Sequence, residues 1–192
     1  MGTGSSEDLR LKILLSTIDV FNTHGIRFTM DDIASYMKIS KKTIYTVYRS
    51  KDELMLDMVD YIFDSIAVSK EETMNNSEWS LSDKIKMHLT AMPDAFEHIN
   101  FTELFQLKDK YPEVYAKVRS RLDSGWGPAI HLLMVGKEQG VIKPDANVIV
   151  FKMMMETSLM AFFESDILKK SGLTYKEGLE IVVDILLDGI KV

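Results

Sequence analysis

Residues 28–54 read FTMDDIASYMKISKKTIYTVYRSKDEL, and this stretch decides the fold. It divides into two short helical segments joined by a three-residue turn at 38–40. Thr29 is suited to cap the first segment, Ser40 the second, and Ser50 a longer helix that follows, because their hydroxyls can accept hydrogen bonds from the free N–H groups of a helix start. Two short helices with such a turn predict a helix-turn-helix.

Positive charge is concentrated in this part of the chain. From Arg27 to Lys51 there are six basic and two acidic residues, a net of +4, whereas the whole chain carries -6 and the remainder therefore -10. The second short helix presents a face of cations, hydroxyls and one aromatic ring, namely Lys41, Lys42, Thr43, Tyr45 and Thr46. Cations release counterions from phosphates, and polar side chains near a helix start can reach base edges in the major groove. We expect this face to bind double-stranded operator DNA.

The rest of the sequence is helical in its periodicity. Apolar residues recur at helical spacing nearly everywhere, and no stretch alternates with a period of two for long, so the fold class is all-α. A first helix is expected at 7–24, and the helix that Ser50 caps should fade into a polar loop at 71–80. Further helices are expected at 81–97, 101–110, 113–139 with a break at 125–128, 147–165 and 174–190. The predicted boundaries are 1–50 for the DNA-binding domain and 51–192 for a helical body.

The ordered run Ile33-Ala34, Ser40, Thr43-Ile44-Tyr45, then an aromatic residue and Ser50-Lys51-Asp52 resembles the signature of TetR-family transcriptional regulators. The resemblance implies an N-terminal three-helix DNA-binding domain and a C-terminal helical domain that binds a ligand and dimerises. It further implies a regulator, typically a repressor that a small-molecule effector releases from its operator. Two residues depart from the pattern: Lys38 replaces the usual turn glycine, and Lys42 stands where glycine or proline is frequent.

The resemblance also assigns roles to individual residues of the first domain. Positions that contact phosphates or bases in the family are occupied here by Thr29, Lys42, Thr43, Tyr45 and Lys51. Thr46 is expected to face the groove, and Tyr48 matches an aromatic residue that packs inside the domain.

The last two predicted helices are apolar around most of their circumference. A helix of this kind is buried on two sides, either deep in a core or between subunits. The resemblance favours a homodimer formed as a four-helix bundle from these helices. The residues predicted for that interface are Phe151, Met155, Leu159, Phe162, Val182 and Leu186.

Methionines and aromatic residues of the middle segment could line an effector cavity, because flexible methionines suit adaptable pockets. The candidates are Met87, Met92, Phe96, Phe105, Trp126, Met134 and Met155. Taken one by one, each is better explained as an ordinary core residue. The acidic body suggests a weak preference for neutral or cationic ligands.

Several functional classes find no support in the residues. The chain has no cysteine, no HExxH pattern, no nucleophile elbow and no phosphate-binding loop, so we predict no cofactor, no metal site and no enzymatic activity. It shows neither a long apolar span nor a signal segment, and we expect a cytoplasmic protein without a membrane partner. Two alternatives stay open: an all-α dimeric interaction scaffold without an effector, and a small helical enzyme.

Overall fold

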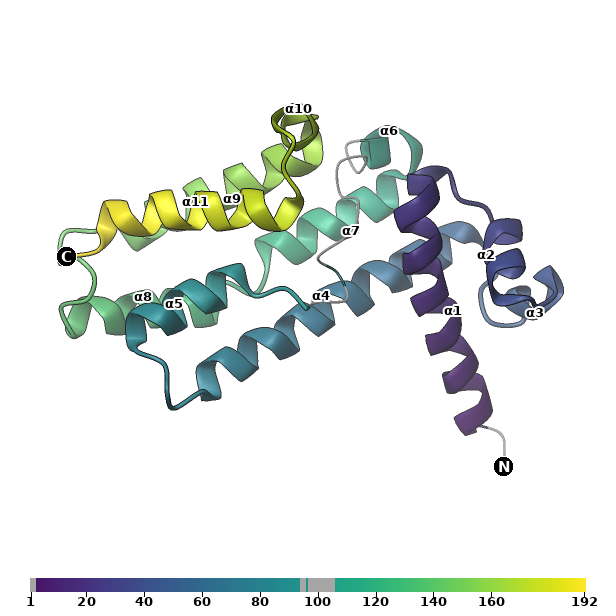
Figure 1. The fold of residues 1–192 in the computed structure, drawn as a ribbon, viewed down its shortest axis with the longest axis horizontal. Coiled ribbons are helices and arrows are strands. Elements are labelled where there is room, and N and C mark those ends of the chain that lie inside the picture. The colour runs from purple at the N-terminus through teal and green to yellow at the C-terminus, as the bar shows by residue number, and fades with distance from the viewer. Residues whose placement is uncertain (1–2, 94–95, 97–105) are drawn as a thin grey trace.

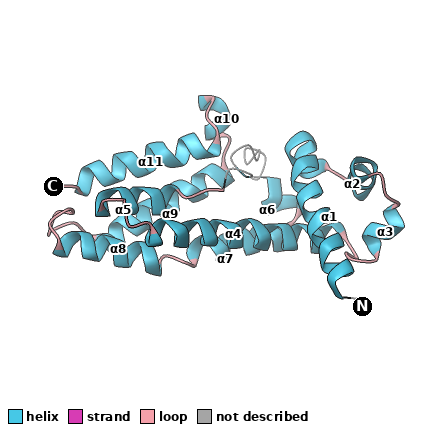
Figure 2. Ribbon diagram, turned by 60° about the horizontal axis from the view of Figure 1, so that its bottom comes forward, coloured by secondary structure: helices cyan, strands magenta, loops and turns pink. Residues whose placement is uncertain are grey.

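The computed structural model describes residues 3–93, 96 and 106–192, and within them the chain is built from helices and loops (Figures 1 and 2). A small head contains α1 (Thr3–His24), α2 (Met30–Met37) and α3 (Lys41–Tyr45), with a 3-10 turn at Gly25–Arg27 after α1. Figure 1 shows α2 and α3 at one end of the molecule and the C-terminus at the other. The all-α fold class predicted from periodicity is confirmed for the described residues.

The head forms the predicted helix-turn-helix around a small apolar core of Phe21, Ile33, Ile44 and Leu54, which are all buried. Thr29 begins α2 with a capping box, in which its hydroxyl accepts from the N–H of Asp32 and the Asp32 carboxylate accepts from the N–H of Thr29. Ser40 caps α3 in the same way through the N–H of Thr43. The helix α3 ends at Tyr45, whereas the sequence pattern predicts a helix over 41–48.

The turn between the two short helices contains the unusual Lys38. Its backbone is left-handed, with φ 55°, a conformation in which glycine is the ordinary residue. The N–H of Ile39 donates to the carbonyl of Ala34 at 3.0 Å, which closes α2 while Lys38 projects into solvent. The turn therefore tolerates a side chain at this position, as the sequence requires.

The long helix α4 (Lys51–Asn75) connects the head to the body. Ser50 caps it by accepting from the N–H of Glu53, as expected. The predicted loop from residue 71 is wrong, because α4 continues to Asn75. Thr73 is buried against the body and its hydroxyl bonds the carbonyl of Lys70 at 2.7 Å, so tertiary packing holds the last polar turn in the helix.

The first half of the body packs around α4. It consists of α5 (Leu81–Thr90), α6 (Leu107–Lys110), α7 (Pro112–Asp123) and α8 (Gly127–Glu138). The helix α4 packs on α5 and α7, and α5 packs on α8. The predicted break at 125–128 is confirmed: Gly125 has φ 85°, and Pro128 stands in the first turn of α8, where no N–H is needed.

The second half consists of α9 (Val148–Glu164), the short α10 (Ile167–Ser171) and α11 (Tyr175–Ile190), of which α10 was not predicted. Figures 1 and 2 show α9 and α11 side by side, and α11 also packs on α5. No helix of the described residues is both long and apolar enough to cross a membrane.

The two faces of α9 correct the predicted interface. Phe151 is 3% exposed, and Met155, Leu159 and Phe162 are likewise buried inside the chain itself. Met153, by contrast, is 56% exposed. The four α9 residues assigned to a subunit interface are therefore core residues, because α7, α8 and α11 already cover that face. Val182 and Leu186 of α11 are partly buried at the edge of the same core.

One buried histidine gives the fold a pH dependence. His88 of α5 is buried, and its Nδ1 lies 3.3 Å from the carbonyl of Lys70. Burial, and then the nearby Lys70 charge, lower the pKa of His88 below its ordinary value of 6.5. The imidazole therefore stays neutral in the folded chain at a pH where the unfolded chain takes up a proton.

We expect the free energy of unfolding to fall as pH drops below 6.5, since the unfolded state then binds one more proton than the folded state. One proton contributes at most about 1.4 kcal/mol per pH unit. Urea unfolding of His88→Gln and wild type across this range measures the difference. His131→Gln, at an exposed histidine, is the matched control. An equal pH slope in His88→Gln and wild type contradicts the assignment.

Candidate nucleic-acid interface and internal cavity

The outer face of α3 carries the predicted DNA-binding side chains. Lys41, Lys42, Tyr45 and Thr46 are exposed on it, and Thr43 is half-buried. The ammonium of Lys41 lies 2.6 Å from the carboxylate of Asp31 in an exposed ion pair. Lys42 has no charged partner among the residues that the structure describes. The face thus offers one unpaired cation and one aromatic ring to a partner.

The hydroxyl groups of this face are engaged within the head. Thr43 shares a hydrogen bond with Ser40 at 2.8 Å, and Thr46 donates to the carbonyl of Thr43 at 2.6 Å. Thr29 is held in its capping box by Asp32, and the hydrogen bonds from Thr29 lower the pKa of the Asp32 carboxyl. These threonines fix the position of the face. The hydroxyl of Thr29 or Thr46 would have to give up its hydrogen bond within the head in order to donate to a phosphate oxygen.

Lys51 makes contacts within the protein that the sequence does not predict. Its ammonium donates to the carbonyl of Ile26 at 2.6 Å and lies 4.1 Å from the ring centroid of Phe28 and 4.9 Å from that of Tyr111. The side chain is partly buried between the head and the start of α7. These contacts join the head to the body, and the role of Lys51 as a direct phosphate contact stays a prediction.

A second connection fixes the head to α4. Tyr48 is buried, as predicted for the packed aromatic, and its hydroxyl donates to the carboxylate of Asp57. The Nε of Arg10 donates to the same carboxylate at 2.8 Å. Burial, and then the Asp57 carboxylate, raise the pKa of Tyr48, so the phenol remains a donor at any ordinary pH. The helix α1 and the segment after α3 are thereby both joined to the first turns of α4.

A cavity of about 220 Å³ lies beneath α4. Its walls come from α5, α7, α8, α9 and α11, and from Ile18 and Phe21 of α1, which belong to the head. The lining is mostly aliphatic and aromatic, with two basic side chains, Lys70 and Arg121. Apolar cavities with a few polar groups are the usual form of small-molecule sites.

The structure brings together part of the predicted effector set. Met92, Trp126 and Met155 line the cavity. Phe96 is buried outside the lining, edge-on to Tyr61, and Phe105 lies outside the described residues. The prediction that Met87 and Met134 line the cavity is wrong. Their side chains are 40% and 45% exposed, because they lie on the outer faces of α5 and α8.

Sequence reasoning missed most of the wall that α4 supplies. Met58, Ile62 and Ile66 line the cavity, and Lys70 follows them at the same spacing of four. Their spacing marks the inward face of a helix, but periodicity cannot distinguish a filled core from the wall of a cavity. The lysine on that face is the signal that could have marked it.

Comparison with known proteins agrees with this architecture. Residues 13–58 match the family model of the bacterial regulatory proteins of the tetR family. The chain is 27% identical over 179 residues to the uncharacterized HTH-type transcriptional regulator YvaF of Bacillus subtilis, covering 93% of this chain and 94% of that protein. The N-terminal domain therefore carries the TetR-family pattern, and the chain as a whole is similar to regulators of that family. These similar proteins are transcriptional regulators, not enzymes.

Solved TetR-family structures share the fold along nearly the whole chain. A regulator from Haloarcula marismortui superposes with a TM-score of 0.74 at 16% identity, covering 97% of this chain and 100% of that one. One from Cytophaga hutchinsonii gives 0.71 at 16% identity, with 98% and 97% covered.

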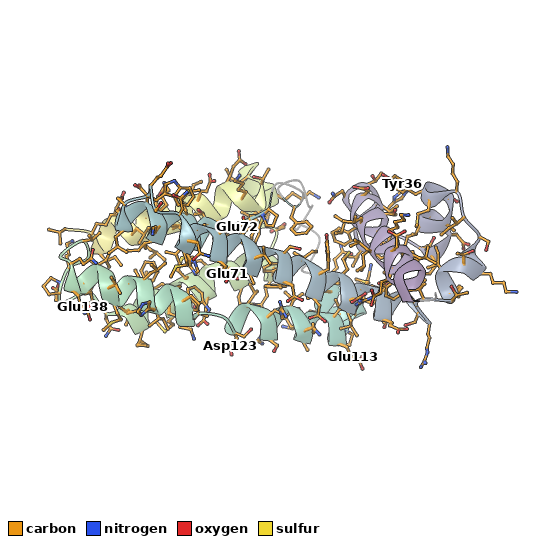
Figure 3. All side chains as sticks on the ribbon, turned by 90° about the horizontal axis from the view of Figure 1, so that it is seen from below. Tyr36, Glu71, Glu72, Glu113, Asp123 and Glu138 are labelled. Carbon is orange, nitrogen blue, oxygen red and sulfur yellow. The ribbon has the colours of Figure 1, made fainter. Side chains whose placement is uncertain are left out.

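Acidic side chains lie on the body, as the sequence predicts. Figure 3 labels five exposed carboxylates, Glu71, Glu72, Glu113, Asp123 and Glu138, and all lie along α4, α7 and α8 of the body, away from Tyr36 in the head. An acidic body repels the phosphate backbone, so DNA is steered toward the basic head.

Proposed function

We propose that this TetR-family regulator is a homodimeric repressor that leaves its operator when a small molecule enters the cavity beneath α4. The observation that carries the proposal is the composition of the cavity wall. Ile18 and Phe21 of the head and Met58 to Lys70 of α4 enclose the same space. A ligand there contacts both the element that carries the DNA face and the body that holds it.

Coupling follows from the way the head is attached. The helix α4 starts at Lys51, where the ammonium lies between Phe28 of the head and Tyr111, the residue just before α7. A ligand that separates α4 from α7 shifts this contact and tilts the head. It can do so only by its difference in affinity between the two arrangements, and a coupling of about 1–3 kcal/mol lowers DNA affinity about 5- to 150-fold.

The proposed dimer uses the outer faces of α9 and α11. Large apolar side chains are exposed there, namely Ile149, Val150, Met153, Met154, Ile181 and Ile185. Several large exposed apolar side chains on the same two helices are typical of an interaction surface. Two copies joined here present two α3 faces, which suits an operator with two-fold symmetry.

The DNA face is tested by Lys42→Ala and Tyr45→Ala. Each variant is expected to weaken operator binding by about 1–3 kcal/mol, because an exposed cation or ring that meets the duplex is lost. The measurement is fluorescence anisotropy on a duplex that the wild-type protein selects from random sequences. Thermal unfolding is expected to match wild type, since both side chains lie outside the core.

Lys169→Ala, which removes an exposed cation from α10, is the matched control. Wild-type operator affinity in both α3 variants contradicts the assignment of this face. The slope of binding against salt concentration separates the regulator from a scaffold without a DNA role, because only phosphate binding gives a steep linear dependence.

Effector release is tested with a library of small metabolites. Ligands are first identified by the fluorescence of Trp126 in the cavity wall, and operator affinity is then measured at saturation. Undiminished DNA affinity with every ligand found excludes release by an effector, while leaving a dimeric DNA-binding protein.

A further inference from the structure

The chemistry of the cavity wall is asymmetric. Among the residues that the structure describes, its lining includes two cations, Lys70 and Arg121, and no carboxylate. The remaining wall is apolar apart from a few groups such as the hydroxyls of Ser124 and Tyr175. The acidic composition of the body therefore does not extend to the cavity, and the preference for neutral or cationic ligands expected from net charge does not describe it.

Arg121 is already neutralised by the protein. One of its terminal nitrogens is paired with the carboxylate of Asp64, and the other lies 3.6 Å from that of Asp60. Its guanidinium also stands 5.5 Å from the ring centroid of Phe63. These contacts draw the charge of Arg121 toward the surface of α4 and leave little of it for a ligand.

Lys70 is different. Among residues 3–93, 96 and 106–192 its ammonium has no carboxylate partner, although burial is deep enough to lower the pKa of Lys70. Its own carbonyl is taken by His88 and Thr73. His88 beside it is neutral or cationic at any pH, so it cannot offset the positive charge of Lys70. A desolvated, unpaired ammonium is unfavourable, and an incoming anion relieves that penalty.

Lys70 lies at the end of an apolar row of cavity residues on α4. Met58, Ile62, Ile66 and Lys70 follow one another at intervals of four residues, so they lie along one side of α4. About 18 Å separates the first and last of them along the helix axis, at the usual rise of 1.5 Å per residue. A ligand that matches this wall is elongated and apolar, with one negative end.

We propose that the cavity binds an amphipathic monocarboxylate, with its carboxylate paired to Lys70 and its hydrocarbon chain along Met58, Ile62 and Ile66. This inference rests on the proposed function, because it takes the cavity to be the effector site. It adds the chemical class of the effector and the residue that selects it.

The test uses the full-length protein with Trp79→Phe as background, so that Trp126 of the cavity wall is the sole tryptophan reporter. Dissociation constants are measured for octanoate, decanoate and dodecanoate, for the primary alcohols of the same chain lengths, and for the primary amines. The best carboxylate is expected to bind about 10- to 100-fold more tightly than its alcohol, the gain expected of a charge-assisted hydrogen bond. The amine is expected to bind least.

Lys70→Met is expected to remove this preference while the alcohols keep their affinity. Methionine retains the apolar stem of the side chain and removes a buried charge, so the variant is expected to fold. Lys70→Arg is expected to restore the preference. Lys169→Met makes the same change of net charge on α10, outside the lining, and is expected to behave like wild type.

The proposal is overturned if no carboxylate binds, if carboxylate and alcohol bind equally, or if Lys70→Met keeps the carboxylate preference. Operator affinity, measured in the same samples, distinguishes failure of the proposed ligand class from failure of the proposed release from DNA. Carboxylate binding that depends on Lys70 but leaves DNA affinity unchanged contradicts effector release and leaves the ligand class standing. If a different class of ligand releases the DNA and carboxylates are not preferred, the proposed ligand class is wrong and effector release stands.

Discussion

Replacing Ile185 by glutamate is expected to convert the dimer into a monomer and to lower the affinity for a two-fold operator about 100-fold or more. Ile185 is 66% exposed on the outer face of α11, where the proposed interface would bury it. A buried carboxylate without a partner is strongly unfavourable, and the variant has one in each subunit. A single α3 face then loses the gain in affinity that two linked faces provide.

Sedimentation velocity gives the oligomeric state, and anisotropy on the selected operator gives the affinity. Ser120→Glu, an exposed position on α7, is the matched control and is expected to leave both unchanged. An intact dimer in Ile185→Glu at micromolar concentration would show that the outer face of α11 does not join the subunits. A charge at Leu159 is expected to unfold the chain instead, because that side chain is buried within it.

Replacing Phe28 by alanine is expected to lower the free energy of unfolding by about 3–5 kcal/mol, the range for truncating a buried phenylalanine. Phe28 is fully buried, edge-on to Phe21 with ring centroids 6.3 Å apart, and the ammonium of Lys51 lies 4.1 Å from its centroid. The change therefore removes core packing, an aromatic pair and a cation-π contact together.

Urea unfolding measures this loss, at one fixed protein concentration because dimer stability depends on concentration. Tyr45→Ala is the control within the same head. Its exposed ring should change stability by no more than about 0.5 kcal/mol while weakening DNA binding. A loss below about 1 kcal/mol in Phe28→Ala would mean that the head closes over the vacated space.

The DNA head could be derived from the sequence because its signals are local. Thr29, Ser40 and Ser50 cap helices within three residues of themselves, and each cap is present. Exposure of the α3 face also follows from spacing alone. The role of Lys51 could not be derived, because its partners include Tyr111, which lies 60 positions further along the chain.

The cavity, too, could be found only from the tertiary structure, because its walls come from segments that are far apart in the sequence. Periodicity identifies Met58, Ile62 and Ile66 as inward-facing, but it does not tell whether the space opposite them is filled. That depends on how closely α7, α8 and α9 approach α4, and therefore on the volumes of side chains from five or more helices. Met87 and Met134 share the composition of cavity residues and lie on the surface.

By itself, the sequence determined the helical class, the helix-turn-helix with its basic face, the break at Gly125 and the apolar character of the last two helices. Only the tertiary structure decided which side of α9 is core and which is free, since both sides are apolar and hydrophobicity has no direction. Packing against α7, α8 and α11 made Phe151 and Met155 internal and left Met153 outside. Local signals fix the elements, whereas contacts between distant segments choose the faces that carry function.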